Sequence, residues 1–242
     1  MEKYILFFVL AFVAEIIGTV SGFGSSILFV PIASWFMDFK SVLAVTAVFH
    51  VFSNLSKILL FRKGVDRKIA LKLGIPAVIF VLTGAILTNY IPVKEIELLM
   101  NILLVSLSVF LVWKSNKKLE QTDRNLVLGG TISGFLAGLI GTGGAIRGIT
   151  LAAFRLKKNA FIATSAIIDL AVDGGRMIVY LASGYLHASS LIYIPFLIGI
   201  SWIGSWIGKL ILGHISEHIF RIFVLVIILG ISITQVIMYL SK

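Results

Sequence analysis

Cysteine is absent from this 242-residue chain, which excludes disulfides, thiolate metal sites and covalent carriage of sulfur on a thiol. Charge is scarce as well, because Asp, Glu, Lys and Arg together make up 13% of the residues. Hydrophobic residues make up 59% of the chain, and its mean hydropathy is +1.06. These values lie far outside those of soluble domains and predict an all-α, multi-pass membrane protein.

The few charges that are present are unbalanced, with a formal net charge of +10. In a membrane protein such an excess is typical of cytoplasmic loops that face anionic lipid. No basic run accompanies a soluble fold, so we expect the lipid bilayer and no nucleic acid as a partner. The first apolar run, Tyr4 to Val20, contains Glu15 and ends in glycines rather than in a cleavage site. We therefore expect it to belong to the mature structure.

Eight apolar segments follow one another along the chain, and each unbroken one is close to the ~20 residues that span a bilayer. They cover residues 4–37, 41–61, 69–90, 93–113, 125–154, 159–183, 188–212 and 215–240.

Two of these segments are interrupted by glycine. The run from Gly22 to Pro31 divides the first segment, and the run from Gly141 to Thr150 divides the fifth. Glycine at this density, or proline, opposes a continuous helix, so each segment is predicted to form two half-helices. Backbone amides freed at membrane depth are tolerated only where they are buried in protein or line a polar cavity. The two breaks are therefore candidate binding sites.

A shift of 119 residues superimposes one half of the sequence on the other. It pairs Gly22 with Gly141, Gly24 with Gly143, Pro76 with Pro195, and the intramembrane Lys57 with Arg176. Matched glycine, proline and basic positions are uncommon by chance in an apolar chain. We predict a single transmembrane domain, 1–242, made of a repeat 1–118 and a repeat 119–242.

The distribution of Lys and Arg indicates how the segments cross the membrane. If all eight segments cross, the basic residues divide between the two sides with little bias. If each broken segment is a re-entrant hairpin, only Lys3, Lys40, Lys94 and Lys242 lie opposite the other non-membrane basic residues. The positive-inside rule favours this second arrangement, in which each half has one re-entrant hairpin and three transmembrane helices. An odd number of crossings makes the two repeats inverted, and the polar connector Lys114–Arg124 is then cytoplasmic.

The sequence also resembles a known family. The residues that carry the resemblance are Gly22, Gly24, Pro31 and Ala44-Val45-Thr46, then Gly141, Gly143, Gly144 and Ala163-Thr164-Ser165. This repeated pattern resembles the TauE/SafE family of sulfite and organosulfur-anion exporters over nearly the whole chain. The resemblance implies a plasma (inner) membrane permease for small sulfur-containing anions. The sequence departs from the family pattern at Ser25-Ser26, at Thr150 in place of a second proline, and at Arg147.

Both breaks have the chemistry of an anion site. A half-helix that begins within a break directs its free amides and the positive end of its dipole into that break. The residues predicted to bind substrate at the breaks are Gly22, Gly24, Ser25, Ser26, Gly141, Thr142, Gly143 and Gly144, where Ser25, Ser26 and Thr142 add hydroxyl donors. The alternative is that these glycines only allow close helix packing.

Basic and amide side chains predicted at membrane depth extend this site. A cation buried in the membrane is costly unless it is paired or hydrated, so such a side chain is a candidate substrate ligand. The candidates are the basic residues Arg147, Arg176 and Lys57, together with the amide of Asn54. Two alternatives stay open: Arg147 could extend to the cytoplasmic face, and Lys57 could be a lipid-facing anchor.

Carboxylates in the same helices suggest proton coupling. Asp169, Asp173 and Arg176 recur at spacings of four and three, and His50, Asn54 and Lys57 recur at the same spacings in the first half. An Asp173–Arg176 ion pair that only fixes packing is the alternative, and it would leave Asp169 unpaired. The candidate proton-coupling residues are Asp169, Asp173, His50 and Glu15, although Glu15 could instead bind freed backbone.

No pattern for metal or cofactor binding is present, because the four histidines form no intramembrane cluster with carboxylates and no nucleophile or phosphate-loop motif occurs. We therefore predict no cofactor and no enzymatic activity. The function predicted is a secondary transporter of a small anion with proton-coupled alternating access, and a homo-oligomer stays open as its assembly. An anion channel is the alternative, since it would use the same amides without an occluded state.

Overall fold

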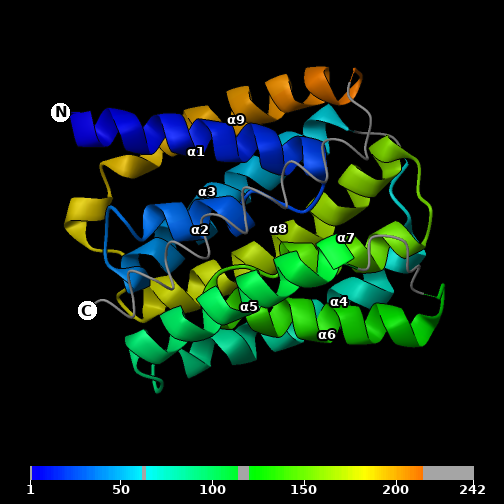
Figure 1. Ribbon diagram of the computed structural model, residues 1–242, viewed down its shortest axis with the longest axis horizontal. Helices are drawn as coiled ribbons and strands as arrows, with labels where there is room; N and C mark the ends of the chain where they lie inside the picture. Colours follow the sequence, from blue (N-terminus) through cyan, green and yellow to red (C-terminus); the bar gives the residue numbers. More distant parts are fainter. Residues whose placement is uncertain (1, 62–63, 114–119, 215–242) are drawn as a thin grey trace.

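The computed structural model describes residues 2–61, 64–113 and 120–214, and these residues are all-helical (Figure 1). The first half contains α1 (Glu2–Ser21), α2 (Ser26–Ala33), α3 (Phe39–Leu60), α4 (Arg67–Leu87) and α5 (Val93–Trp113). The second half contains α6 (Asp123–Ile140), α7 (Gly144–Ala153), α8 (Lys158–Ala182), the short 3₁₀ helix η1 (Ala188–Ser190) and α9 (Tyr193–Leu212). The predicted all-α class is thereby confirmed for this part of the chain.

Seven of the eight predicted segments correspond to these helices, and the eighth, 215–240, lies outside the described residues. Within the described ranges, four stretches are long and apolar enough to cross a membrane: Glu2–Ser21, Phe39–Leu60, Arg67–Leu87 and Ala188–Leu212. Side-chain caps fix the start of three helices. The Asp38 carboxylate accepts from the Ser41 amide at 3.0 Å before α3, and Asp66 and Thr122 do the same before α4 and α6.

Each glycine-rich stretch breaks its segment where the sequence predicts. Gly22, Gly24 and Gly141 have φ angles of 70°, 83° and 78°, in the left-handed region that favours glycine. Position 143 requires glycine for a different reason, which is the close approach of another backbone segment. Its φ is −139°, but a Cβ at this position would stand 1.9 Å from the Ser133 carbonyl oxygen. A Cβ at Gly144 would likewise stand 2.0 Å from the Phe23 carbonyl oxygen. The second break therefore needs glycine at Gly141 for its dihedral angles and at Gly143 and Gly144 for close approach.

The long helices lie side by side along the long axis of the molecule (Figure 1). Helices α1 and α9 form one side, α4, α5 and α6 form the other, and α3 and α8 lie between them. Helices α3 and α8 are antiparallel. Ser41 at the start of α3 donates to the Tyr185 carbonyl just after α8, and Thr164 near the start of α8 accepts from the Asp66 amide just after α3.

Small residues hold each half against the other. A Cβ at Gly134 of α6 would stand 2.1 Å from the Ala77 carbonyl oxygen of α4, and Gly130 and Gly138 are equally close to Leu73 and Val81. On the opposite side, Gly204 and Gly208 of α9 pack against Glu15 and Thr19 of α1. This is the close packing through small residues that is usual between membrane helices.

The two broken segments enter the fold from opposite ends. Phe7 near the start of α1 packs against Phe36, which follows α2, with ring centroids 5.3 Å apart. Both ends of this hairpin thus lie together, next to the start of α9, where Tyr4 meets Tyr193. In the other hairpin, Thr150 of α7 packs against Gly129 of α6, at the end where Lys72 and Asp123 form an ion pair.

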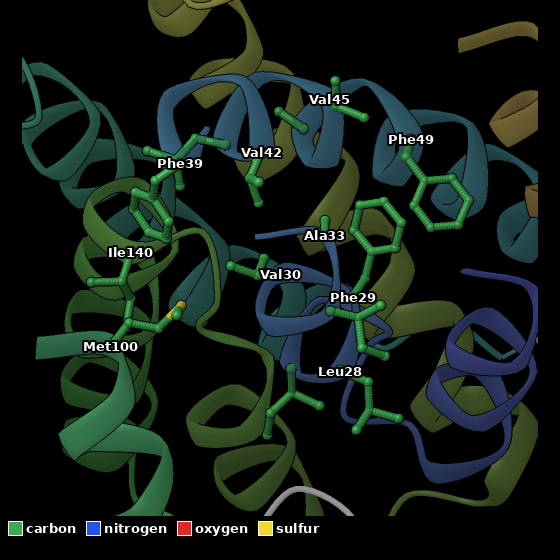
Figure 2. Close-up of a cluster of buried hydrophobic side chains, with 14 of the residues drawn as sticks. Leu28, Phe29, Val30, Ala33, Phe39, Val42, Val45, Phe49, Met100 and Ile140 are labelled. Atoms are coloured by element: carbon green, nitrogen blue, oxygen red, sulfur yellow. The ribbon is translucent and has the colours of Figure 1, made fainter. Parts of the chain in front are cut away.

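An apolar cluster holds the short helix α2 in place. Every residue of α2 is buried, and Figure 2 shows Leu28, Phe29 and Val30 among side chains of α3, α5 and α6. The rings of Phe29 and Phe49 lie 4.8 Å apart. An isolated helix of this length is not stable on its own, so packing determines where its N-terminus points. That N-terminus lies beside the second break, where Ser26 Oγ is 3.3 Å from Thr142 Oγ1.

Candidate functional site

A small polar cavity lies between the two breaks. Its volume is about 20 Å³, room for about one water molecule, so a larger ligand needs the walls to move apart. The walls come from both breaks and from the facing surfaces of α3 and α8. The lining residues are Gly24, Ser25, Ser26, His50, Ser53, Asn54, Lys57, Ala137, Gly141, Gly143, Gly144, Arg147, Asp169, Val172, Asp173 and Arg176.

The first ion pair of this cavity joins α7 to α8. Arg147 is buried, its Nη1 pairs with Asp169 Oδ1, and its Nε donates to Ser165 Oγ at 3.2 Å. The Ser165 hydroxyl in turn donates to Asp169 Oδ2 at 3.2 Å. Arg147 therefore does not extend to the cytoplasmic face. The sequence predicted that an Arg176–Asp173 ion pair would leave Asp169 unpaired. This prediction is wrong, because Arg147 forms an ion pair with Asp169.

The second ion pair closes the break between α6 and α7. Arg176 Nε and Nη2 donate to Asp173 Oδ1 at 2.8 and 2.7 Å, and Nη1 donates to the carbonyl oxygens of Ala137 and Gly141 at 3.1 and 2.7 Å. A further Nη2 hydrogen bond of 3.3 Å reaches His50 Nδ1. All five guanidinium donors are thus used, three of them on groups other than the carboxylate. In this conformation Arg176 has no N–H left for a substrate.

The repeat-related residue of Asp173 completes this group. Asn54 of α3 donates from Nδ2 to Asp173 Oδ2 at 2.7 Å, across a separation of 119 residues. The polar residues that recur at spacings of four and three in α3 and α8 therefore lie on helix faces that meet directly.

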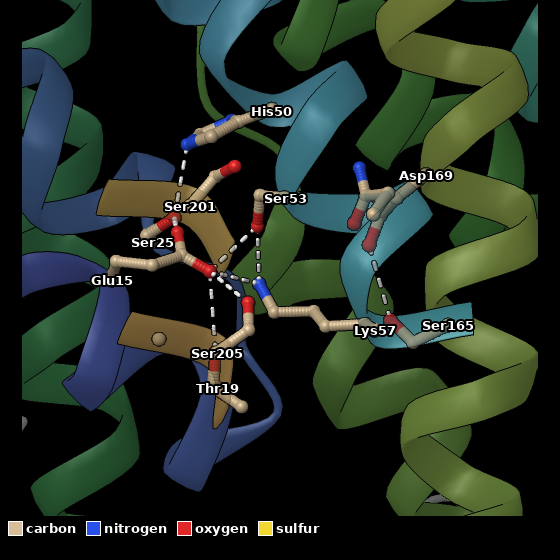
Figure 3. A network of polar contacts seen from close by, with 12 residues as sticks. Glu15, Thr19, Ser25, His50, Ser53, Lys57, Ser165, Asp169, Ser201 and Ser205 are labelled. Carbon is tan, nitrogen blue, oxygen red and sulfur yellow. Dashed lines mark hydrogen bonds and ion pairs between the residues drawn. The ribbon is translucent and has the colours of Figure 1, made fainter. Parts of the chain in front are cut away.

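The third ion pair lies between α1 and α3 (Figure 3). Lys57 Nζ is 2.9 Å from Glu15 Oε1, and both side chains are buried. The same oxygen accepts from the hydroxyls of Ser53, Ser205 and Thr19 at 2.6, 2.8 and 3.3 Å. Lys57 is thus not a lipid-facing anchor, and the partners of Glu15 are side chains rather than backbone freed at the break.

The charges of the three pairs balance. Arg147, Arg176 and Lys57 face Asp169, Asp173 and Glu15, one carboxylate to each cation. Buried ions are costly, and these pairs are tolerable because neighbouring hydroxyl, amide and carbonyl groups supply further hydrogen bonds. An anion that enters this balanced site adds an uncompensated negative charge unless a carboxylate takes up a proton.

Most of the residues that the sequence singled out line the cavity, but three do not. Gly22 faces the ring of Phe161, where a Cβ would stand 2.4 Å from the ring. Thr142 Oγ1 lies 3.3 Å from Ser26 Oγ and links the two breaks. Glu15 lies behind Ser25 and Lys57, out of the cavity wall.

Four hydroxyl residues of the site were not predicted: Thr19, Ser53, Ser165 and Ser205. Ser53 precedes Lys57 by four residues and Ser165 precedes Asp169 by four, so helical spacing could have identified both. Thr19 follows Glu15 at the same spacing. Ser205 of α9 carries no such signal, since its position depends on how α9 packs against α1.

Among the described residues, no group of three His, Asp or Glu side chains is placed to hold a metal ion. His214 follows α9, and its Nδ1 lies 3.0 Å from the Leu210 carbonyl oxygen. His218 lies outside the described residues.

Comparison with known proteins places this arrangement in context. The family model described as sulfite exporter TauE/SafE matches residues 7–234. A probable membrane transporter protein of Methanocaldococcus jannaschii is 30% identical over 211 residues, which cover 78% of this chain and 78% of that relative. The family match extends through both breaks and through the residues of all three buried ion pairs.

Proposed function

Since the chain belongs to the sulfite exporter TauE/SafE family of membrane transporters, we propose that it carries a small sulfur-containing anion, such as sulfite or an organosulfonate, by proton-coupled alternating access. The observation that carries this proposal is the balanced cavity between the two breaks, where two helix N-termini and a paired arginine converge.

The anion is expected to bind at Arg147. A Cβ at Gly24 would stand 3.7 Å from Arg147 Nη2, and one at Gly144 would stand 3.2 Å away, so this guanidinium lies against both breaks. The first amides of α2 and α7 have no partners within their own helices, and the helix dipoles favour negative charge there. An oxyanion can replace Asp169 at the planar guanidinium.

Displacement of Asp169 supplies the coupling. Once Arg147 binds the anion, an ionised Asp169 would face the anion without its cation, and uptake of a proton removes that charge. For a substrate with one negative charge, the site then contains the same net charge with and without substrate. Anion and proton are therefore expected to move together through the cavity.

Inverted repeats supply the alternating access. We take 1–118 and 119–242 as the two repeats, because the 119-residue shift relates α1 to α6, α2 to α7 and α3 to α8. The antiparallel α3 and α8, and hairpins that enter from opposite ends, support this assignment. The end that contains the basic residues is assigned to the cytoplasm of a plasma membrane. These residues are Arg67, Lys68, Lys72, Arg124, Arg155, Lys157, Lys158 and Lys209.

Flux in proteoliposomes tests the function. Sulfite uptake should accelerate when the sulfite-containing side is made acidic, and unlabelled sulfite inside should stimulate entry of labelled sulfite by exchange. An anion channel would give flux that follows the membrane potential, without exchange and without a response to the pH gradient. Flux of that kind would contradict the carrier mechanism.

Labelling of single cysteines tests the topology, and the cysteine-free chain gives a clean background. Cysteines at Gln121 and Asn159, which lie before α6 and near the start of α8, should react with an impermeant maleimide from the cytoplasmic side. A cysteine at Ser189, beyond the other end of α8, should react from outside. Labelling of Gln121 and Asn159 from opposite sides would exclude the re-entrant hairpin, since α6 and α7 would then cross the membrane.

A further inference from the structure

A chain of hydrogen bonds leads from the cavity to Glu15. Arg176 Nη2 lies 3.3 Å from His50 Nδ1, His50 Nε2 lies 3.0 Å from Ser25 Oγ, and Ser25 Oγ lies 2.7 Å from Glu15 Oε2. Figure 3 shows His50, Ser25 and Glu15 in this order. His50 lines the cavity, whereas Glu15 lies behind its wall. The chain therefore connects a carboxylate outside the cavity with the space where substrate binds.

The Arg176 guanidinium at one end and the Glu15 carboxylate at the other determine which group donates in each hydrogen bond. A guanidinium only donates, so His50 Nδ1 accepts from Arg176 and a neutral His50 carries its hydrogen on Nε2. That N–H donates to Ser25 Oγ, which leaves the hydroxyl hydrogen of Ser25 for Glu15 Oε2. All the donors point toward Glu15. This is the arrangement that proton transfer to a carboxylate requires.

We propose that Glu15 is a second proton acceptor of the transport cycle and that His50 and Ser25 conduct the proton to it from the cavity. This inference rests on the proposed function, since it adds a second coupling site to the one at Asp169.

The transfer of one proton from the cavity to Glu15 conserves atoms and charge without a further reactant. A proton from cavity water binds His50 Nδ1 in place of the Arg176 N–H. The Nε2–H bond of His50 then breaks as its proton moves to Ser25 Oγ, and the original hydroxyl proton of Ser25 moves to Glu15 Oε2. Glu15 is now a neutral acid, Ser25 is again a hydroxyl, and His50 is neutral with its hydrogen on Nδ1. The reverse sequence returns the proton to the cavity.

Protonation of Glu15 changes the charge available to substrate. The groups that face Glu15 are Thr19 on α1, Ser53 and Lys57 on α3, Ser205 on α9, and Ser25 at the break. Lys57 is the charged one among these contacts, and it also lines the cavity. A neutral Glu15 therefore releases one positive charge to the cavity. With Asp169, the site can take up two protons, which matches the charge of a sulfite dianion.

Simultaneous measurement of sulfite and proton flux in proteoliposomes tests the inference. Glu15→Gln should transport sulfite with a proton-to-sulfite ratio about one lower than wild type, because one of two titrating carboxyls is removed. Ser25→Ala should show the same reduced ratio, and Ser25→Thr should restore it by returning the hydroxyl. Ser201→Ala is the matched control and should keep the wild-type ratio, since Ser201 is equally buried but donates to the Ile198 carbonyl of its own helix.

A wild-type ratio in Glu15→Gln would overturn the second proton site while leaving the proposed function intact. Absence of pH-driven sulfite flux in the wild-type protein would overturn the proposed function itself. A second measurement is made on the wild-type protein, and a variant serves only to assign the signal. Nitrogen NMR of histidine-labelled protein, assigned by the signal lost in His50→Gln, should find the Nε2–H tautomer of His50 in the resting state. The Nδ1–H tautomer would overturn the relay.

Discussion

Asp169→Asn should raise the apparent affinity for sulfite at alkaline pH by about tenfold to over a hundredfold and flatten its pH dependence. In the wild-type protein an ionised Asp169 competes with the anion for Arg147, so affinity is expected to fall as the pH rises. An asparagine keeps the shape and the hydrogen bond to Ser165 but cannot ionise. The range corresponds to one charge-assisted contact of about 1.5–3 kcal/mol. The KM for sulfite flux at acid and alkaline pH measures the effect.

Matched variants separate the partners of this pair. Asp169→Glu should keep the pH dependence, and Arg147→Leu should abolish saturable flux, with only partial recovery in Arg147→Lys because a point charge does not reproduce the planar fork. Residual pH dependence in Asp169→Asn should disappear in the double variant Glu15→Gln/Asp169→Asn. If Asp169→Asn keeps the wild-type profile, coupling does not occur at Arg147. Normal transport by Arg147→Leu would assign the anion to the backbone amides alone.

Arg176→Leu should greatly reduce the amount of folded protein. The substitution leaves Asp173 as a buried charge without its cation and removes the donors of the Ala137 and Gly141 carbonyls at the second break. Loss of one partner of a buried ion pair costs about 3–5 kcal/mol. The midpoint of thermal unfolding in detergent, with the monodisperse fraction in size-exclusion chromatography, measures this loss.

The double variant Arg176→Leu/Asp173→Leu should recover part of the lost stability, because it removes the unpaired charge along with the arginine. Arg124→Leu is the control for the substitution itself, since Arg124 is exposed in the first turn of α6. If Arg176→Leu unfolds at the same temperature as Arg124→Leu, the guanidinium does not support the break, and its donors are available for a substrate.

Several features of this protein follow from the sequence alone, because each depends on local chemistry. Hydropathy over about 20 residues identifies the apolar segments, and four described stretches are long and apolar enough to cross a membrane. The positive φ angles at Gly22, Gly24 and Gly141 are accessible mainly to glycine, so the positions of the breaks could be identified in advance. The spacing of Asp169, Asp173 and Arg176 likewise placed them on one helix face. The family resemblance is confirmed by the match over residues 7–234.

The pairing of the charges was decided by tertiary structure. Helical periodicity places residues on a face but does not tell which helix that face meets, so the sequence left the partners of Arg147 and Lys57 open. Because α7 packs near α8, Arg147 forms an ion pair with Asp169. Because α1 packs near α3, Lys57 forms an ion pair with Glu15. Ser205 reached Glu15 only because Gly204 lets α9 pack closely on α1. Charges at membrane depth must find partners, and which partner each one finds depends on contacts between helices far apart in the chain.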